Sequence, residues 1–288
     1  MGRELDRPRL DAPGAPRLKG SRYRHAMDKG DRPSSPFGQL LRRWRERRGL
    51  SQLHLAAEAG TTPRHVSFLE TGRSRPGPEL VLRLAASLDV PLRERNALLG
   101  AAGLAPEFPA LALTAEAMRP IADVVDRVLR GHDPYPAWVY TRGLRALAAN
   151  RTGEALFPGL CALEPEAIVD LWFAPGPFRE MVENWQDVAW AGVRSLRREA
   201  QRTSDPATLE LLRRAEAHSQ RTLLPEAHAP DDLPVVCPRF RIGGRVVRTV
   251  STVLRFDTAV EVTASELRVE LMFPGDAASD AFFRELSS

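Results

Sequence analysis

The sequence has 288 residues and contains little cysteine. Its two cysteines, Cys161 and Cys237, lie 76 positions apart, and neither belongs to a CxxC or CxxH pair. This pattern argues against a structural zinc site and against a secreted disulfide framework. We expect the two thiols to act as small buried apolar side chains, and we expect no metal or other cofactor.

Long hydrophobic runs are also missing. The most apolar stretch, residues 97–113, is interrupted by Pro106, Glu107 and Pro109, and the amino terminus carries no apolar segment followed by a cleavage site. Because a membrane-spanning helix needs about 20 apolar residues, we expect neither a membrane span nor a signal peptide. The sequence therefore predicts a cytoplasmic protein.

The common enzyme motifs are absent from the sequence as well. It contains no GxSxG, P-loop or HExxH spacing, and its six histidines are scattered. We predict that the protein is not an enzyme. An enzyme fused to a targeting module stays an alternative, since catalytic groups can converge from scattered positions.

Charge is distributed unevenly along the chain, although the net value is only +4. Residues 1–34 carry a net +4 and residues 35–103 a net +5, whereas residues 104–288 carry a net −5. The basic part favours a nucleic-acid partner, because neutralising phosphates with release of counterions provides the sequence-independent share of the affinity. The charge by itself is equally compatible with a basic face that is only solvated by water.

The composition divides the chain into three parts. Residues 1–34 are rich in Pro, Gly, Arg and Asp and have no apolar periodicity, which predicts a disordered basic arm. Residues 35–106, the amino-terminal module, show apolar residues every three or four positions and glycines where helices should stop. The five helices expected there begin near Pro36, Gln52, Pro63, Pro78 and Leu92.

Residues 107–288, the carboxyl-terminal module, mix helical and strand patterns and predict an α+β domain preceded by a linker helix. The expected helices span residues 114–131, 150–157, 165–172, 178–203, 206–219 and 279–286. The expected strands span residues 137–140, 145–149, 239–242, 245–256 and 266–273. Gly243-Gly244 between two β-branched runs is a strong hairpin signal. We expect one antiparallel sheet of about five strands, with helices inserted between its second and third strands.

The most specific signal lies between Gly49 and Gly72. Two short helices meet at a turn containing Gly60, and the small side chain of Ala56 lets them cross closely. If the second helix enters the major groove of DNA, its outward residues reach base edges and thymine methyl groups, and Arg64 has the geometry to bind guanine. These outward residues are Thr62, Arg64, His65, Ser67 and Phe68. An all-helical adaptor without a DNA partner is the alternative.

This segment resembles the lambda-repressor-like (Xre-type) helix-turn-helix family. The family pattern matches Leu50-Ser51-Gln52, Ala56, Gly60 and Leu69-Glu70-Thr71-Gly72. The resemblance implies a double-stranded DNA operator bound by a homodimer, because the half-sites of such proteins lie about one helical turn apart. It further implies that the phosphate backbone is held by Gln52, Arg73 and Arg75.

Two features of the segment leave its details open. Arg45 and Glu70 either form an internal ion pair, as is frequent in the family, or contact DNA. Pro63 and Phe68 occupy positions that are usually polar, so we expect fewer direct contacts to bases, and more apolar ones, than is usual in the family.

The rest of the chain resembles the MmyB-like (MltR-like) regulator ligand-binding domain. The resemblance rests on Asp133-Pro-Tyr-Pro-Ala137, Leu147-Ala-Ala-Asn150, Leu196-Arg-Arg-Glu-Ala200 and Glu266-Leu-Arg-Val-Glu270 before Phe273-Pro274. It implies a PAS-like fold and a fatty-acid-type effector.

Aromatic residues are frequent in this module, and we expect most of them to lie in its core. Our hypothesis for the effector site is an apolar cavity lined by Trp138, Tyr140, Trp172, Trp185 and Val188. The sequence thus predicts a sequence-specific DNA-binding transcriptional regulator that senses a small apolar or fatty-acid-like molecule. The alternative is a carboxyl-terminal module for protein interaction or dimerisation, without an effector.

Overall fold

A computed structural model of the chain describes residues 35–203, 205–219 and 235–288. The predicted disordered arm, residues 1–34, lies outside the described residues. The described residues belong to one compact unit. Among the described residues, no helix has the length and apolar character to cross a membrane. The domain boundary between residues 106 and 107 stays a prediction.

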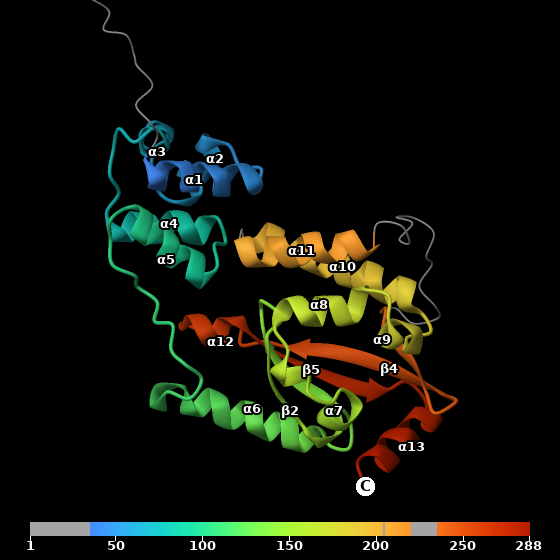
Figure 1. The fold of residues 1–288 in the computed structure, drawn as a ribbon. Helices are drawn as coiled ribbons and strands as arrows, with labels where there is room; N and C mark the ends of the chain where they lie inside the picture. The colour runs from blue at the N-terminus through green and yellow to red at the C-terminus, as the bar shows by residue number, and fades with distance from the viewer. Residues whose placement is uncertain (1–34, 204, 220–234) are drawn as a thin grey trace, which may run out of the picture. The chain divides into compact units, whose positions relative to one another are not determined.

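The amino-terminal module is built from five helices, α1 to α5 (Figure 1). They span Pro36–Arg47, Gln52–Glu58, Pro63–Glu70, Pro78–Ser87 and Leu92–Ala101, so the predicted start of each helix is confirmed. The hydroxyls of Ser51 and Thr62 cap α2 and α3 by accepting hydrogen bonds from the N–H groups of His54 and His65. Between these helices the chain turns through Gly60, which has a φ of +63° that other residues rarely adopt.

A very close crossing of α1 and α3 fixes the direction of α3. A Cβ atom on Gly38 would lie 2.5 Å from the carbonyl oxygens of Leu69 and Glu70. Ala56 of α2 is buried in the same core, together with Trp44 and Val66. The absence of a side chain at position 38 therefore lets the two helix backbones touch.

The carboxyl-terminal module contains one five-stranded antiparallel sheet in the order β2-β1-β5-β4-β3. The strands β1 to β5 span Ala137–Thr141, Ala146–Ala149, Arg239–Ile242, Arg245–Leu254 and Leu267–Pro274. Gly243 and Gly244 join β3 and β4 with positive φ angles, as the hairpin signal predicts. The α+β class, the sheet and the position of the inserted helices are confirmed, and this arrangement is PAS-like.

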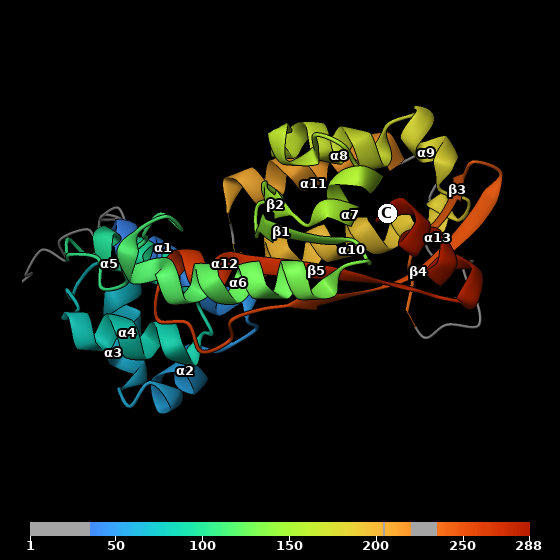
Figure 2. The same ribbon diagram turned by 90° about the horizontal axis from the view of Figure 1, so that it is seen from below.

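Different helices cover the two faces of the sheet (Figures 1 and 2). On one face, α6 (Arg119–His132) packs Val125 and Leu129 against Val139 and Val269. On the other face lies a larger apolar cluster that includes Trp138. Its helical members come from α8 (Pro165–Phe173), α10 (Trp185–Thr203), α11 (Pro206–Ser219) and α13 (Ala277–Leu286), and α7 (Arg151–Leu156) packs beside it.

The prediction of one continuous helix over residues 178–203 is wrong. The structure has two helices, α9 (Pro177–Met181) and α10, separated at residues 182–184. Val182 forms an isolated β-bridge with Phe240 of β3. The Asn184 side chain donates to the carbonyl oxygen of Cys237 and accepts from the N–H of Arg239. These tertiary hydrogen bonds outweigh the helical periodicity of the segment.

A short helix, α12 (Val262–Glu266), precedes β5 where the sequence predicts none. Its N-cap is the carboxylate of Glu261, which accepts hydrogen bonds from the N–H groups of Ala264 and Leu111, both at 2.7 Å.

Of the two cysteines, Cys237 is buried as expected, whereas Cys161 is only half-buried.

The buried side chain of Asn150 ties α6, β1 and α7 together. Its Oδ1 accepts hydrogen bonds from the N–H groups of Ala137 and Gly153, both at 2.9 Å. Its Nδ2 donates to the carbonyl oxygen of Tyr135 at 2.7 Å and to Asp133 Oδ1 at 3.0 Å. One amide thus satisfies several backbone groups away from water and caps α7 at the same time.

We expect Asn150→Ala to lower the free energy of unfolding by about 3 kcal/mol, because it removes an N-cap and leaves buried polar groups without partners. The matched control is Asp276→Ala, which removes the N-cap of α13 and should cost about 1 kcal/mol. Urea unfolding of the full chain measures both values. Equal losses in the two variants would contradict the joining role of Asn150.

Candidate DNA-binding surface and the ion-pair network

The predicted DNA-contacting residues lie on α3, at the start of α2 and in the loop that follows α3. Thr62, Arg64, Arg73 and Arg75 are exposed, while Gln52, His65, Ser67 and Phe68 are half-buried. The guanidinium carbon of Arg64 lies 5.2 Å from the centre of the Phe68 ring, and that of Arg73 lies 5.9 Å from the same centre. The aromatic side chain at this usually polar position therefore supports two cations.

His65 and Ser67 contact the chain around α3 in the free protein. The ring nitrogens of His65 lie 3.1 Å from Thr61 Oγ1 and 3.4 Å from Ser74 Oγ. The carbonyl oxygen of Ser67 accepts a hydrogen bond from the Thr71 hydroxyl at 2.7 Å. These contacts connect α3 to the loop that carries Arg73 and Arg75.

An internal ion pair holds α1 against the end of α3. Arg45 donates from Nε to Glu70 Oε1 at 2.6 Å and from Nη2 to Glu70 Oε2 at 2.9 Å. The Glu70 side chain is only 4% exposed, and Gln52 Nε2 donates to its Oε2 at 2.8 Å. Of the two readings left open by the sequence, the geometry is that of the internal pair.

The exposed arginines near α3 differ from most others in the module. Within the described part of the chain, Arg64, Arg73 and Arg75 form no ion pair. Arg42 and Arg83, in contrast, bind a glutamate on their own helix. Unpaired guanidinium groups around a helix-turn-helix are suited to bind the phosphates and base edges of DNA.

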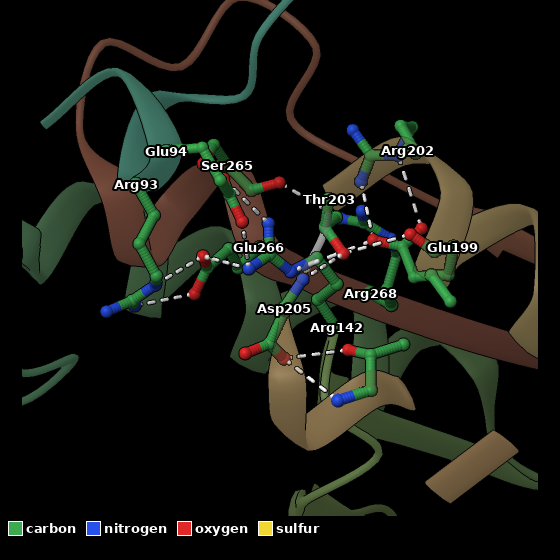
Figure 3. Close-up of polar contacts among 12 residues, drawn as sticks. Arg93, Glu94, Arg142, Glu199, Arg202, Thr203, Asp205, Ser265, Glu266 and Arg268 are labelled. Carbon is green, nitrogen blue, oxygen red and sulfur yellow. Dashed lines mark hydrogen bonds and ion pairs between the residues drawn. The ribbon is translucent and has the colours of Figure 1, made fainter. Parts of the chain in front are cut away.

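A second polar site connects the two modules through Arg142 in the turn between β1 and β2 (Figure 3). The Arg142 side chain is 5% exposed and lies within ion-pair distance of three carboxylates. Its Nη2 is 3.0 Å from Glu94 of α5 and 3.3 Å from Glu266 of α12, and its Nε is 3.7 Å from Glu199 of α10. One buried cation is thus shared by helices of both modules.

Two arginines of the amino-terminal module also form hydrogen bonds with the carboxyl-terminal module. Arg93 donates from Nε and Nη2 to the two carboxylate oxygens of Glu266, each at 2.7 Å (Figure 3). Arg47 of α1 donates to the carbonyl oxygen of Ala200 at the end of α10, at 2.8 Å. Burial raises the pKa of Glu94, while Arg142 acts in the opposite direction. The charges of Arg142, Glu94 and Glu266 depend on one another because burial removes most of their hydration.

No pattern in the sequence points to this network. Arg142, Glu94 and Glu199 come from separate elements, and no spacing in the sequence relates them. Glu266 lies in a stretch that carries the family resemblance, but its partners are visible only in the folded chain.

The five predicted effector-binding residues lie on or near the sheet face that carries the larger apolar cluster. Trp138, Trp172, Trp185 and Val188 belong to this cluster or pack against it, whereas Tyr140 lies on β1 outside it. The Phe157 ring lies 5.4 Å from the Trp138 ring and 6.3 Å from the Trp172 ring. The structure therefore brings four of the five residues together around an aromatic interior.

Polar groups interrupt this apolar face at Trp138. Its Nε1 is buried and has no hydrogen-bond partner among the described residues. Glu270 of β5 stands directly opposite Trp138 in the strand register, and burial raises the pKa of its carboxyl group. Burial likewise raises the pKa of Tyr140, two residues further along β1.

Comparison with known proteins finds a match for each of two parts of the chain. The family model for the MmyB-like transcription regulator ligand binding domain matches residues 121–286, and a helix-turn-helix model matches residues 41–95. Over 76 residues, 26% of this chain, the sequence is 41% identical to an uncharacterized HTH-type transcriptional regulator, RghRB, of Bacillus subtilis (strain 168). The chain matches about half the length of this relative, 52%. The chain belongs to the family of transcription regulators with an MmyB-like ligand binding domain, here preceded by a helix-turn-helix.

Proposed function

We propose that this protein is a cytoplasmic, sequence-specific regulator that binds operator DNA through α3 and responds to a small molecule in its carboxyl-terminal module. The observation that carries the proposal is the set of exposed, unpaired guanidinium groups around α3, whose backbone is fixed by the Gly38 crossing and the Arg45–Glu70 pair. We propose no catalytic activity for it.

Base reading and phosphate binding fall to different residues in this proposal. Arg64, supported on the Phe68 ring, contacts base edges in the major groove together with Thr62, His65, Ser67 and Phe68. Gln52, Arg73 and Arg75 bind phosphates. Gln52 gives one N–H of its amide to Glu70, and the second N–H is available for a phosphate oxygen.

For the effector, we propose an apolar or fatty-acid-like molecule that opens the aromatic interior between Trp138, Trp172, Trp185 and Val188 and extends to Tyr140 on β1. The buried indole N–H of Trp138 supports this, because an unpartnered buried donor is costly and a ligand oxygen would satisfy it. Opening the interior requires the ring contacts around Phe157 to rearrange.

The coupling of effector and DNA runs, in this proposal, through the Arg142 network. A homodimer places two copies of α3 on two half-sites, and the network links α5 of each copy to its sheet and α10. An effector changes DNA affinity only if it binds two arrangements of these elements with different affinity.

Arg64→Ala should reduce discrimination between operator variants by about 1–3 kcal/mol at a contacted guanine. Gln52→Ala should weaken binding to all sequences alike, because it removes a phosphate contact that carries no sequence information. Fluorescence anisotropy with operator and random duplexes measures both effects. Arg127→Ala is the control, because this arginine of α6 is exposed and has no ion pair among the described residues. Equal behaviour of the Arg64 and Gln52 variants would contradict the proposed roles.

Full-length protein extracted after purification should contain a bound lipid that mass spectrometry identifies. Trp138→Phe keeps an aromatic ring but removes the N–H, so the variant should bind that lipid about fivefold more weakly, the equivalent of one neutral hydrogen bond. Trp190→Phe is the control, since the Trp190 ring packs beside Arg194. A protein that neither retains nor binds a lipid would favour the interaction or dimerisation module instead.

Arg142→Gln should weaken the contact of α5 with the carboxyl-terminal module, because it leaves the Glu94 carboxylate buried without its cation while Arg93 still binds Glu266. We expect the amides of α5 to lose about 3 kcal/mol of protection in hydrogen–deuterium exchange. Arg145→Gln, in the same turn but in an exposed pair with Glu164, should leave α5 unchanged. Identical exchange in the two variants would exclude the coupling role.

A further inference from the structure

A pocket of about 430 Å³ lies beside the Arg142 network and has walls from both modules. Its volume is within the range of small-molecule sites, about 300–1,000 Å³. The walls comprise residues 89–92, Arg95, Phe108, Arg142, Arg202, residues 255–257, 259–260 and 265–266, and Arg268. The pocket therefore touches the segment before α5, the end of α10 and the start of β5.

Basic side chains dominate the lining of this pocket. The five arginines are Arg95, Arg142, Arg202, Arg255 and Arg268, against three acidic residues, Asp89, Asp257 and Glu266. Some of this positive charge is already neutralised. Arg142 is paired as described above, and Arg202 binds both carboxylate oxygens of Glu199, at 2.8 and 3.2 Å.

Arg268 is a buried cation without a carboxylate partner. It is 8% exposed, and its Nη1 donates only to the carbonyl oxygens of Ser265 and Leu267, at 3.0 and 2.8 Å. In the described part of the chain, no carboxylate lies within ion-pair distance of it. Burial lowers the pKa of Arg268; the more distant carboxylate of Glu199 acts against this, and the nearby Arg202 and Arg255 act with it. A buried charge in this state is costly unless an anion pairs with it.

Arg255 adds a second cation at the mouth of the pocket. It is exposed and makes neither a hydrogen bond nor an ion pair with any residue that the structure describes. The nearby acids do not neutralise it, because Asp257 is exposed and the Asp89 side chain is 90% exposed and 3.8 Å from Arg48. Phe108 and Phe256 supply apolar walls, which strengthen any ion pair formed inside by excluding water.

We propose that this pocket binds a small molecule carrying a phosphate or carboxylate group, with the oxyanion held between Arg268 and Arg255. This site is separate from the apolar interior around Trp138, and its regulatory meaning rests on the function proposed above. Because both modules line the pocket, an anion bound there stabilises the arrangement in which α5 contacts α12 and the turn between β1 and β2. The bound anion therefore acts on the position of the DNA-binding helices.

Isothermal titration of the full chain with pyrophosphate and with succinate, at constant ionic strength in chloride, tests the proposal and separates the phosphate from the carboxylate source. At least one probe should bind. Arg255→Gln should weaken that binding about tenfold or more, since it removes a charge-assisted hydrogen bond. Arg127→Gln, which removes an exposed unpaired arginine from α6, should leave binding unchanged. Failure of both probes to bind, or equal affinities in the two variants, would overturn the proposal.

Arg268→Met gives a second, independent measurement. If the Arg268 charge lacks a partner, this variant should melt in chloride buffer at the same temperature as the parent chain or higher, and pyrophosphate or succinate should no longer stabilise it. A lower melting temperature in chloride would show that the charge is already compensated and would contradict the proposal.

Gel-shift assays with operator DNA on the same proteins distinguish this inference from the proposed function. Operator binding by Arg255→Gln with loss of probe binding supports both. Operator binding by the parent chain without probe binding overturns only the anion site. Probe binding without operator binding by the parent chain supports the anion site and overturns the proposed function.

Discussion

The arrangement of the two modules depends on the desolvation of one cation. Arg142 has lost its water and is stable only because Glu94, Glu266 and Glu199 surround it, and these residues come from α5, α12 and α10. A buried pair of this kind adds little net stability, but breaking it is expensive. Its effect is therefore to specify which surfaces of the two modules meet. The pair of the exposed Arg93 with Glu266 joins the same two surfaces at the edge of the contact.

Local signals explain how much of the fold could be predicted from the sequence. Capping residues, helix-stopping glycines and the Gly243-Gly244 turn act over a few residues, so the five amino-terminal helices and the β3–β4 hairpin could be predicted. The break between α9 and α10 could not, because it arises from hydrogen bonds between Asn184 and the strand region more than fifty residues away. The spacing of apolar residues that predicts a helix contains no information about these distant hydrogen bonds.

The same reasoning applies to the candidate sites. Residues on α3 could be predicted because a short motif with fixed spacing places them on one helix face. The Arg142 network and the arginine-lined pocket could not, since each is assembled from turns and helix ends that lie far apart in the sequence. The structure also adds partners that the motif does not encode, such as the Phe68 ring between Arg64 and Arg73.

The contact of α1 with α3 at Gly38 has a consequence for how operator preference can diverge. With no side chain between the two backbones, the tilt of α3 is set by main-chain contact and cannot be adjusted by exchanging one apolar side chain for another. Related proteins that keep this glycine should present their outward residues from a common platform. In the function proposed above, new operator preferences would come from changes at the exposed positions of α3, with its tilt against α1 unchanged.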